Sequence, residues 1–272
     1  MSSMTGLSSP RRSGSSLDRM LGLLDVFTTA APAWSTEDLI RYSGASRSTL
    51  YRYLKALQAA GLLSPVAGGA WMLGPRIIEL DRTMRLCDPV SAGGGPPMRR
   101  LAAETGFSGL LCLLFSGAVM CVDDVPAAGA PAGLFSRGQK RPLFAGAASK
   151  VILAHLPPHR LRTLFVKHRT TIAAAGLGAD WDAFRNALRL IREAGHCVTI
   201  GEFQPGVLGI AAPLFNAQGE VLGSLGIATE AGRVPPSARP ALAERVMAAA
   251  REACTRLVEE QPQAARPARA VG

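Results

Sequence analysis

The amino-acid sequence predicts an α+β protein with an N-terminal winged helix-turn-helix domain, a linker helix and a C-terminal domain built around an antiparallel sheet. Three observations support this prediction. The chain has 272 residues, which is enough for two domains of ordinary size. Near the N-terminus, helical patterns separated by a glycine-containing turn precede two short strand patterns. Farther along, strand patterns joined by short turns lie beside helical patterns, as is typical of α+β domains.

The charge balance favours a polyanionic partner. There are 30 Lys and Arg against 20 Asp and Glu, a net charge of +10, and 26 of the basic residues are Arg. Because phosphates attract Arg and Lys, this composition agrees with nucleic-acid binding, but a solvated basic surface would have the same composition. With 48% hydrophobic residues the chain can bury a sizeable core, which excludes wholesale disorder.

The cysteines and the first residues of the chain indicate a cytoplasmic protein. Five cysteines are widely spaced without a C-x-x-C pair, so we expect neither a disulfide framework nor a cysteine zinc site. Residues 1–15 are rich in Ser and Arg and lack the apolar segment of a secretory signal. Ser116-Gly117 splits the uncharged run 105–122, which predicts a buried hairpin of strands 109–115 and 118–122 and no membrane span.

Capping residues and apolar spacing define the N-terminal elements. Ser16 is the candidate cap of a first helix with apolar residues at helical spacing, namely Leu17, Met20, Leu21, Leu24 and Phe27. A second helix is expected from Ser35 or Thr36 to Tyr42, and a glycine-containing turn separates it from a third helix. Two strands then predict a wing, at 62–66 and 71–73 around the turn 67–70.

The third helix, which Ser46 caps and Gly61 ends, carries the candidate DNA-binding face. Leu50, Leu54 and Leu57 predict a buried stripe, which leaves polar and basic side chains on the opposite side. No carboxylate occurs from residue 39 to residue 78. Such a face complements the major groove of double-stranded DNA, and Arg47 is the candidate for reading guanine. The predicted DNA-binding residues are Ser46, Arg47, Ser48, Thr49, Tyr51, Arg52 and Lys55.

Changes in composition predict the domain boundaries. Gly74-Pro75 opens a linker helix, and the Gly/Pro run 92–97 predicts a flexible joint. Beyond the hairpin, helices are expected at 145–155, 180–194 and 238–258, and strands at 196–203, 207–214 and 220–228. The predicted parts are a disordered tail at 1–15, a winged helix-turn-helix domain at 16–74, a linker helix and joint at 75–97, the larger domain at 98–260 and a disordered tail at 261–272.

Several motifs give residues 16–258 a resemblance to the IclR-type bacterial transcriptional regulators. The segments that carry it are 17–21, the Ser48-Thr49-x-x-Arg52 pattern, 71–80, 138–150 (similar to G-x-R-x-P-L-H-A-T-A-x-G-K) and 205–213 (similar to P-G-V-x-C-I-A-A-P). The resemblance implies a GAF-like effector-binding domain, a linker helix that helps dimerise, and operator binding as a homodimer or homotetramer in response to a small-molecule effector.

The aligned effector pocket departs from the polar pattern of this family. Thr199 stands at its Asp, Gly209 at its Cys, Gly226 and Ala228 at its two Ser, and Phe144 and Gly146 at its His and Thr. Because a small carboxylate buried without donors is costly, we expect a larger, apolar or aromatic effector oriented by Thr199, Ser224 or backbone N–H groups. A collapsed pocket that serves only dimerisation, an alignment error and a small polar effector stay open. The predicted effector-binding residues are Phe144, Ala145, Gly146, Thr199, Gly209, Ser224, Gly226 and Ala228.

The sequence shows no catalytic constellation, so we expect no enzyme activity, no cofactor and no metal. His155 and His159 stand four residues apart, but Pro157 and Pro158 prevent one regular helix from presenting both rings. The alternative to a DNA-binding regulator is a cytosolic GAF-like sensor or dimerisation protein whose N-terminal helices contact protein. DNA binding that weakens as salt rises would distinguish the two.

Overall fold

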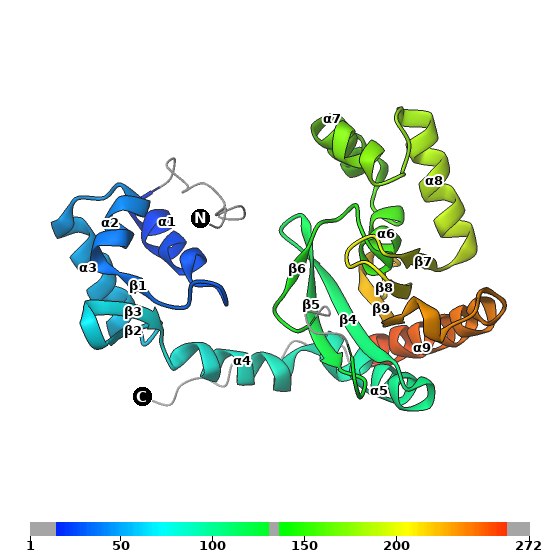
Figure 1. Ribbon diagram of the computed structural model, residues 1–272, viewed down its shortest axis with the longest axis horizontal. Helices are drawn as coiled ribbons and strands as arrows, with labels where there is room; N and C mark the ends of the chain where they lie inside the picture. The colour runs from blue at the N-terminus through cyan, green and yellow to red at the C-terminus, as the bar shows by residue number, and fades with distance from the viewer. Residues whose placement is uncertain (1–14, 131–135, 260–272) are drawn as a thin grey trace. The chain divides into compact units, whose positions relative to one another are not determined.

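The computed structural model describes residues 15–130 and 136–259, and the chain divides into two units at Cys87/Asp88 (Figure 1). Of the two predicted tails, only Ser15 lies within the described residues. It caps the first helix, since its side chain accepts a hydrogen bond from the Asp18 N–H.

The N-terminal unit is a small helical domain with a three-stranded sheet. Its elements are α1 (Ser16–Leu21), a 3₁₀ helix (Gly22–Val26), β1 (Trp34–Ser35), α2 (Thr36–Ser43), α3 (Arg47–Ala59), β2 (Leu63–Val66), a 3₁₀ turn (Ala67–Gly69), β3 (Ala70–Leu73) and α4 (Arg76–Cys87). The sheet has the order β1-β3-β2 and is antiparallel, so the predicted wing is present and gains a third strand that the sequence had not indicated.

The first helix is shorter than predicted. The expected regular helix from Leu17 to Phe27 ends at Leu21 and continues as a 3₁₀ helix. Leu17 and Leu21 are therefore exposed, whereas Leu23 and Val26 are fully buried. The physical reason is the 3₁₀ repeat of three residues per turn, which places Leu23 and Val26 on one face toward the core.

α4 carries exposed apolar side chains within this unit. None of its residues is buried, and Ile78, Leu80, Met84 and Leu86 are exposed to 74, 42, 60 and 69%. Exposed apolar side chains in such number are typical of protein interaction surfaces.

The C-terminal unit contains a six-stranded antiparallel sheet in the order β6-β5-β4-β9-β8-β7. Its elements are α5 (Pro89–Thr105), β4 (Ser108–Phe115), β5 (Ala118–Val125), β6 (Lys140–Arg141), α6 (Ala147–Ala154), α7 (Pro158–Ala174), α8 (Trp181–Ala194), β7 (Cys197–Ile200), β8 (Val207–Phe215), β9 (Val221–Glu230), two 3₁₀ turns (Ala231–Arg233, Pro236–Ala238) and α9 (Arg239–Glu259). The hairpin at Ser116-Gly117 and the turn 216–219 are confirmed. Among the described residues no helix is long and apolar enough to cross a membrane.

Helices cover both faces of this sheet. On one face α5 and α9 pack on Leu111, Ile210 and Leu225, which are buried with Met98 and Val246. On the other face α6 and α8 pack on the alternate strand residues, so that the sheet lies between two helical layers (Figure 1).

α7 was not predicted from the sequence, because Pro157-Pro158 and a basic composition masked its apolar repeat. Leu161, Phe165 and Ile172 are its buried residues. Phe165 contacts Trp181 and Phe184 of α8, with ring centroids 5.6 and 5.5 Å apart. The aromatic cluster holds α7 against α8.

The predicted flexible joint at 92–97 is wrong, since these residues form part of α5. A Cβ atom at Gly93 would lie 3.1 Å from the backbone nitrogen of Leu257, and one at Gly94 would lie 2.8 Å from Leu111 Cδ1. The glycines are therefore close-packing positions, at which α5 approaches α9 and the sheet. The gain from burial against these neighbours outweighs the low helix propensity of Gly and Pro.

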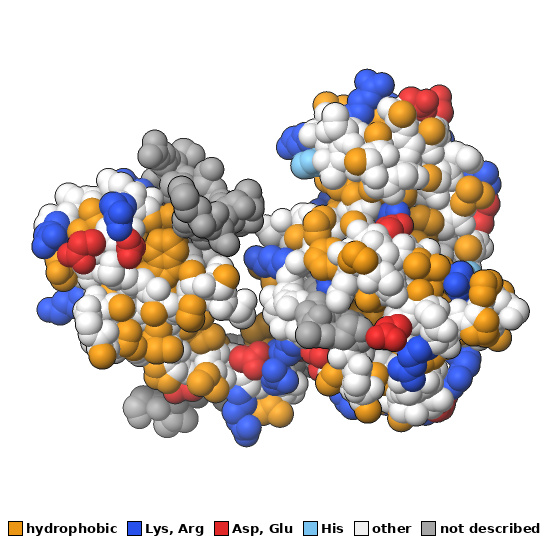
Figure 2. All heavy atoms as spheres, in the orientation of Figure 1, with side chains coloured by type: hydrophobic (Ala, Val, Ile, Leu, Met, Phe, Trp, Pro, Cys, Tyr) orange, Lys and Arg blue, Asp and Glu red, His pale blue; other side chains and the backbone are white. Residues whose placement is uncertain are grey.

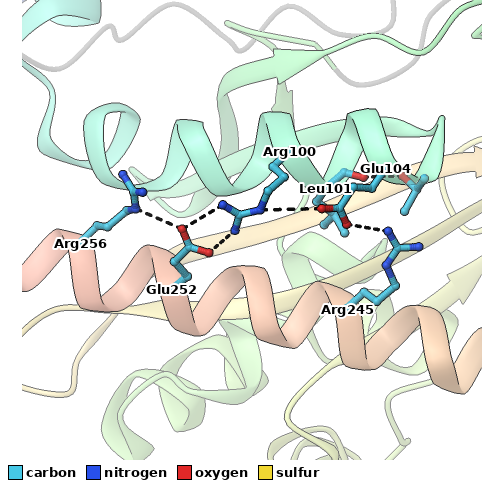
Figure 3. A network of polar contacts seen from close by, with 7 residues as sticks. Arg100, Leu101, Glu104, Arg245, Glu252 and Arg256 are labelled. Carbon is cyan, nitrogen blue, oxygen red and sulfur yellow. Dashed lines mark hydrogen bonds and ion pairs between the residues drawn. The ribbon is translucent and has the colours of Figure 1, made fainter.

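Ion pairs along one side join α5 to α9 (Figure 3). Arg100 pairs with Glu252, and Arg256 Nε lies 3.2 Å from Glu252 Oε1. Arg245 Nη2 lies 2.7 Å from Glu104 Oε2. The Arg100 hydrogen bond is the largest cause of the lowered pKa of Glu252. These pairs are partly exposed, so each contributes little. The buried apolar side chains between the two helices, among them Met98, Leu101 and Leu257, make up their packed core.

Replacing Gly94 by Val is expected to destabilise the C-terminal unit. Its side chain must displace Leu111, which is fully buried, so the free energy of unfolding should fall by about 1–3 kcal/mol. Urea denaturation followed by circular dichroism measures the change. Gly22→Ala is the control, because no atom lies within 4 Å of a Cβ at that position. A Gly94→Val protein as stable as wild type would contradict the close-packing role.

Glu252→Gln is expected to lower stability at neutral pH and to have no effect in acid. The folded-state pKa of Glu252 lies below its ordinary value of 4.5, so its contribution is present above pH 4.5 and is lost as the pH falls through the lowered pKa. Thermal unfolding of both proteins between pH 7 and pH 3 checks this, with the two melting temperatures converging at the acid end. Because the carboxylate is one-third exposed, the difference should be small, about 0.2–1 kcal/mol. A pH-independent difference would rule out the ion pair as its cause.

Candidate functional site

α3 presents a polar and basic face to solvent. Leu50, Leu54 and Leu57 are buried as predicted and, together with Tyr53, fix the helix on the core of the N-terminal unit. The opposite side carries the exposed residues Arg47, Ser48, Tyr51, Arg52 and Lys55. These are five of the seven predicted DNA-binding residues.

The other two predicted residues act in capping the helix. Ser46 Oγ accepts the Thr49 N–H at 3.3 Å, and its hydroxyl donates to Thr49 Oγ1 at 2.9 Å. Both hydroxyls are therefore engaged within the first turn. Their contribution is to hold the start of α3, and with it Arg47, in position.

The cations of this region differ in their partners. Arg41 pairs with Asp38, Arg47 Nη2 lies 3.5 Å from Glu37 Oε1, and Arg76 Nη1 lies 2.6 Å from Glu79 Oε2. Three cations of the acid-free run 39–78 therefore pair with carboxylates that lie just outside it. In the part of the chain that the structure describes, no carboxylate pairs with Arg52 or Lys55. These two are the cations of α3 that are most available to phosphate.

The wing beside α3 has a short, uncharged tip. Its strands pair from Leu63↔Leu73 to Val66↔Ala70, and Gly68 and Gly69 adopt φ values of 78° and 72°, which side chains disfavour. The turn therefore requires glycine, and only backbone groups at the tip can contact a phosphate.

A pocket opens in the C-terminal unit between the N-terminus of α6 and the sheet. The space in it that is free of protein atoms, open solvent included, is about 630 Å³. Its floor includes Leu110, Gly209, Ala211, Gly226 and Ala228 from strands β4, β8 and β9. The floor is therefore apolar and built from small residues and one leucine.

Side chains from the opposite wall hold the start of α6. Thr199 Oγ1 accepts the Ala147 N–H at 3.0 Å, and Glu202 Oε2 accepts the Gly146 N–H at 2.9 Å. Glu202 Oε1 also lies 2.6 Å from Lys150 Nζ, and that ammonium is almost fully buried. Two acceptors thus satisfy the first N–H groups of a helix that has no capping side chain of its own.

Arg141 brings a buried cation to this pocket. Its guanidinium carbon lies 3.1 Å from the ring centroid of Phe203, so the two planes are in contact. Burial lowers the pKa of Arg141 to about 10, which still leaves it charged at neutral pH. The carboxylate in the lining, Glu202, is paired with Lys150, which does not itself line the pocket.

The structure brings together six of the eight predicted effector-binding residues. Ala145, Gly146, Thr199, Gly209, Gly226 and Ala228 line the pocket. Phe144 and Ser224 do not line it: the Phe144 ring lies 5.4 Å from that of His168, and the Ser224 hydroxyl donates to the Ala148 carbonyl at 3.1 Å.

Glycine occupies three positions of the pocket lining for different structural reasons. Gly146 has φ 85°, so its backbone conformation calls for glycine. A Cβ at Gly226 would lie 2.5 Å from the Ile210 carbonyl oxygen, so close strand pairing requires glycine there. A Cβ at Gly209 would make ordinary contacts of 3.5 Å with Thr199 Oγ1 and 3.6 Å with Ala147 Cβ, so this position leaves space that a side chain could fill.

Sequence reasoning missed the charged lining of the pocket. Arg141 and Ser149 lie inside the motif 138–150, but at positions where the family pattern has a variable residue and a glycine. Glu202 and Phe203 lie in the loop that follows β7, which folds over the pocket. The available signal was an Arg that directly precedes the uncharged run 142–149.

Comparison with known protein families identifies both parts of the chain. The family model described as "Bacterial transcriptional regulator IclR C-terminal" matches residues 89–255, and the "IclR helix-turn-helix domain" matches residues 16–66. The helix-turn-helix match covers α1 to β2, and the C-terminal match covers α5 to most of α9.

Curated relatives and solved structures agree with these matches. The chain is 26% identical over 220 residues to the HTH-type transcriptional regulator XynR of Escherichia coli (strain K12), covering 80% of this chain and 87% of XynR. It is 28% identical over 237 residues to the regulator BhcR of Paracoccus denitrificans (strain Pd 1222), covering 87% and 85%. Its fold is similar, at a TM-score of 0.73 and 22% identity over 89% of this chain and 99% of the other, to an IclR homolog from Microbacterium hydrocarbonoxydans complexed with 4-hydroxybenzoate.

Proposed function

This chain belongs to the IclR family of bacterial transcriptional regulators, and we propose that α3 reads its operator while the pocket beside α6 binds the effector that modulates DNA binding. The observation that carries the DNA-binding assignment is the exposed face of α3, with Arg52 and Lys55 free of carboxylate partners among the described residues. Guanidinium and ammonium groups on a helix of this kind complement phosphates and guanine edges in a major groove.

Arg52→Glu is expected to weaken binding to the DNA upstream of its own gene by about a hundredfold or more, because a cation at the phosphates becomes an anion in every chain of the oligomer. Electrophoretic mobility shift measures the affinity, and gel filtration checks that assembly is retained. Arg251→Glu, an equal charge change on the exposed side of α9, is the control. Unchanged binding by Arg52→Glu would contradict the role of α3 and favour protein contacts by the N-terminal helices.

The pocket supports an effector with an apolar or aromatic body and one negative charge. Most of its lining is Ala, Gly, Leu, Ile and Val, which suits a ring or alkyl chain. Arg141 is the cation in its lining, and the lining carboxylate, Glu202, is paired with Lys150. Arg141 therefore supplies, from another wall of the pocket, the hydrogen-bond donors that the family positions lack here. A carboxylate buried beside it would have a charged partner, which offsets the cost of taking it out of water. The 4-hydroxybenzoate in the complex of the Microbacterium homolog is a molecule of this chemical class.

Arg141→Met is expected to abolish most of the stabilisation that an aromatic monocarboxylate gives. Wild type with 4-hydroxybenzoate as probe should melt higher by about 2–4 °C for each kcal/mol that the bound ligand adds to the free energy of unfolding, and the variant should not. Lys140→Met is the matched control, because Lys140 is exposed and does not line the pocket. Stabilisation by pyruvate-sized acids alone would contradict an aromatic effector.

We propose a homodimer or homotetramer as the DNA-binding form, with the exposed apolar residues of α4 in the dimer contact. Burial of these side chains in a partner would remove an exposed apolar surface that the N-terminal unit leaves uncovered.

The proposed role is regulatory and needs neither catalysis nor a cofactor, in keeping with relatives named as transcriptional regulators. A regulator of this kind acts where the DNA is, so we propose that the protein is cytoplasmic.

A further inference from the structure

A second basic surface lies on α7, outside both proposed sites. From residue 125 to residue 179 the chain contains eight Lys and Arg and no Asp or Glu, a longer acid-free run than the one around α3. Four of these cations lie on α7, namely Arg160, Arg162, Lys167 and Arg169. All four are exposed. In Figure 2, blue and pale-blue side chains gather at the α7 end of the C-terminal unit.

The helix spacing arranges these cations in two rows. Arg160 and Lys167 stand seven residues apart, two turns of regular helix, and Arg162 and Arg169 stand seven residues apart across a kink at His168. The exposed residues Thr163 and Thr170 lie on the same helix, and the Thr163 hydroxyl donates to the His159 carbonyl at 3.0 Å. The buried stripe of α7 faces the core, so the cations remain on its solvent side.

None of the four cations forms an ion pair within residues 15–130 and 136–259. Arg162 lies over the Trp181 ring at 4.8 Å, and Arg169 Nε donates to the Ala179 carbonyl at 3.1 Å. Elsewhere in this unit Arg189 pairs with Glu193 on α8, whereas Arg185 on α8 and Arg251 on α9, like the α7 cations, form no ion pair among the described residues. What distinguishes α7 is that its four cations lie on one helix within an acid-free run.

We propose that the exposed face of α7 is a second DNA-binding surface, which contacts backbone phosphates of the duplex beyond the segment read by α3. Arg, Lys and Thr side chains are common donors to phosphate, and such contacts need no base sequence. A protein partner would require an apolar anchor at the centre of the face, and Val166 is the one large apolar side chain there. The inference rests on the proposed operator binding, which raises the local concentration of DNA and lets weak phosphate contacts form.

The double variant Arg160→Gln, Lys167→Gln in the full-length protein tests this proposal. Both side chains are exposed, and among the described residues neither forms an ion pair or a side-chain hydrogen bond. Folding should therefore be retained. The dissociation constant is measured by fluorescence anisotropy against salt concentration, on a short duplex that covers the operator and on a longer duplex with the operator at its centre. On the longer duplex the slope of log Kd against log salt should become shallower by up to about 1.8 per chain, at about 0.9 for each lost phosphate contact. On the short duplex it should not change.

The control is the double variant Arg185→Gln, Arg251→Gln, which removes the same charge from exposed positions on α8 and α9. Its slopes on both duplexes should equal those of wild type. The proposal is overturned if the α7 variant and the control give the same slope on the longer duplex. It is also overturned if the only effect of the α7 substitutions is on the binding of an acidic protein. The two proposals can fail separately. Loss of the α7 contacts leaves binding to the short duplex intact, whereas an Arg52→Glu protein that still binds the short duplex would show that the assignment of α3 is wrong.

Discussion

The close approach of α5 to the sheet is the constraint on which the C-terminal domain depends. Gly93 and Gly94 let the helix backbone pass directly over Leu257 and Leu111, and no larger residue could occupy either position without displacing them. β4 is thereby fixed with Leu111 toward α5. Because side chains alternate along a strand, the preceding residue, Leu110, points to the opposite face and forms part of the pocket floor. Packing on one face of the sheet thus sets the geometry of the binding site on the other.

The polar groups of the pocket come from a different wall than the family pattern indicates. The strand positions carry Gly209, Gly226 and Ala228, so the floor is apolar, and polarity enters from Arg141 and the loop after β7. Glu202 links that loop to both the N-terminus of α6 and Lys150. Because Phe203 lies against the guanidinium of Arg141, a ligand that bound this guanidinium would also contact or displace the loop. In the proposed function we therefore expect ligand binding and loop position to be coupled through Arg141.

The basic residues of the chain fall into two groups with different physical roles. Those between α5 and α9, or within single helices, pair with carboxylates and neutralise charge inside the protein. Arg52 and Lys55 on α3 and the four cations on α7 have no carboxylate partner among the described residues, whereas Arg47 on α3 pairs with Glu37. Each of the two helices is anchored by a buried apolar stripe on its other side. The net charge of +10 is thus less informative than the distribution of unpaired cations.

The sequence by itself determined the elements whose signals are local. Ser35 and Ser46 cap α2 and α3, and Ser116-Gly117 and residues 216–219 close hairpins, because caps and turns depend on φ preferences and hydrogen bonds within a few residues. Only the tertiary structure decided that the Gly/Pro run 92–97 is helical, that residues 158–174 form a helix, and that Arg141 reaches the pocket. Each of these depends on partners distant in the chain: Leu111 and Leu257, the aromatic residues of α8, and the loop that carries Phe203. Burial against such partners outweighs local propensity, and a pattern of neighbouring residues does not encode it.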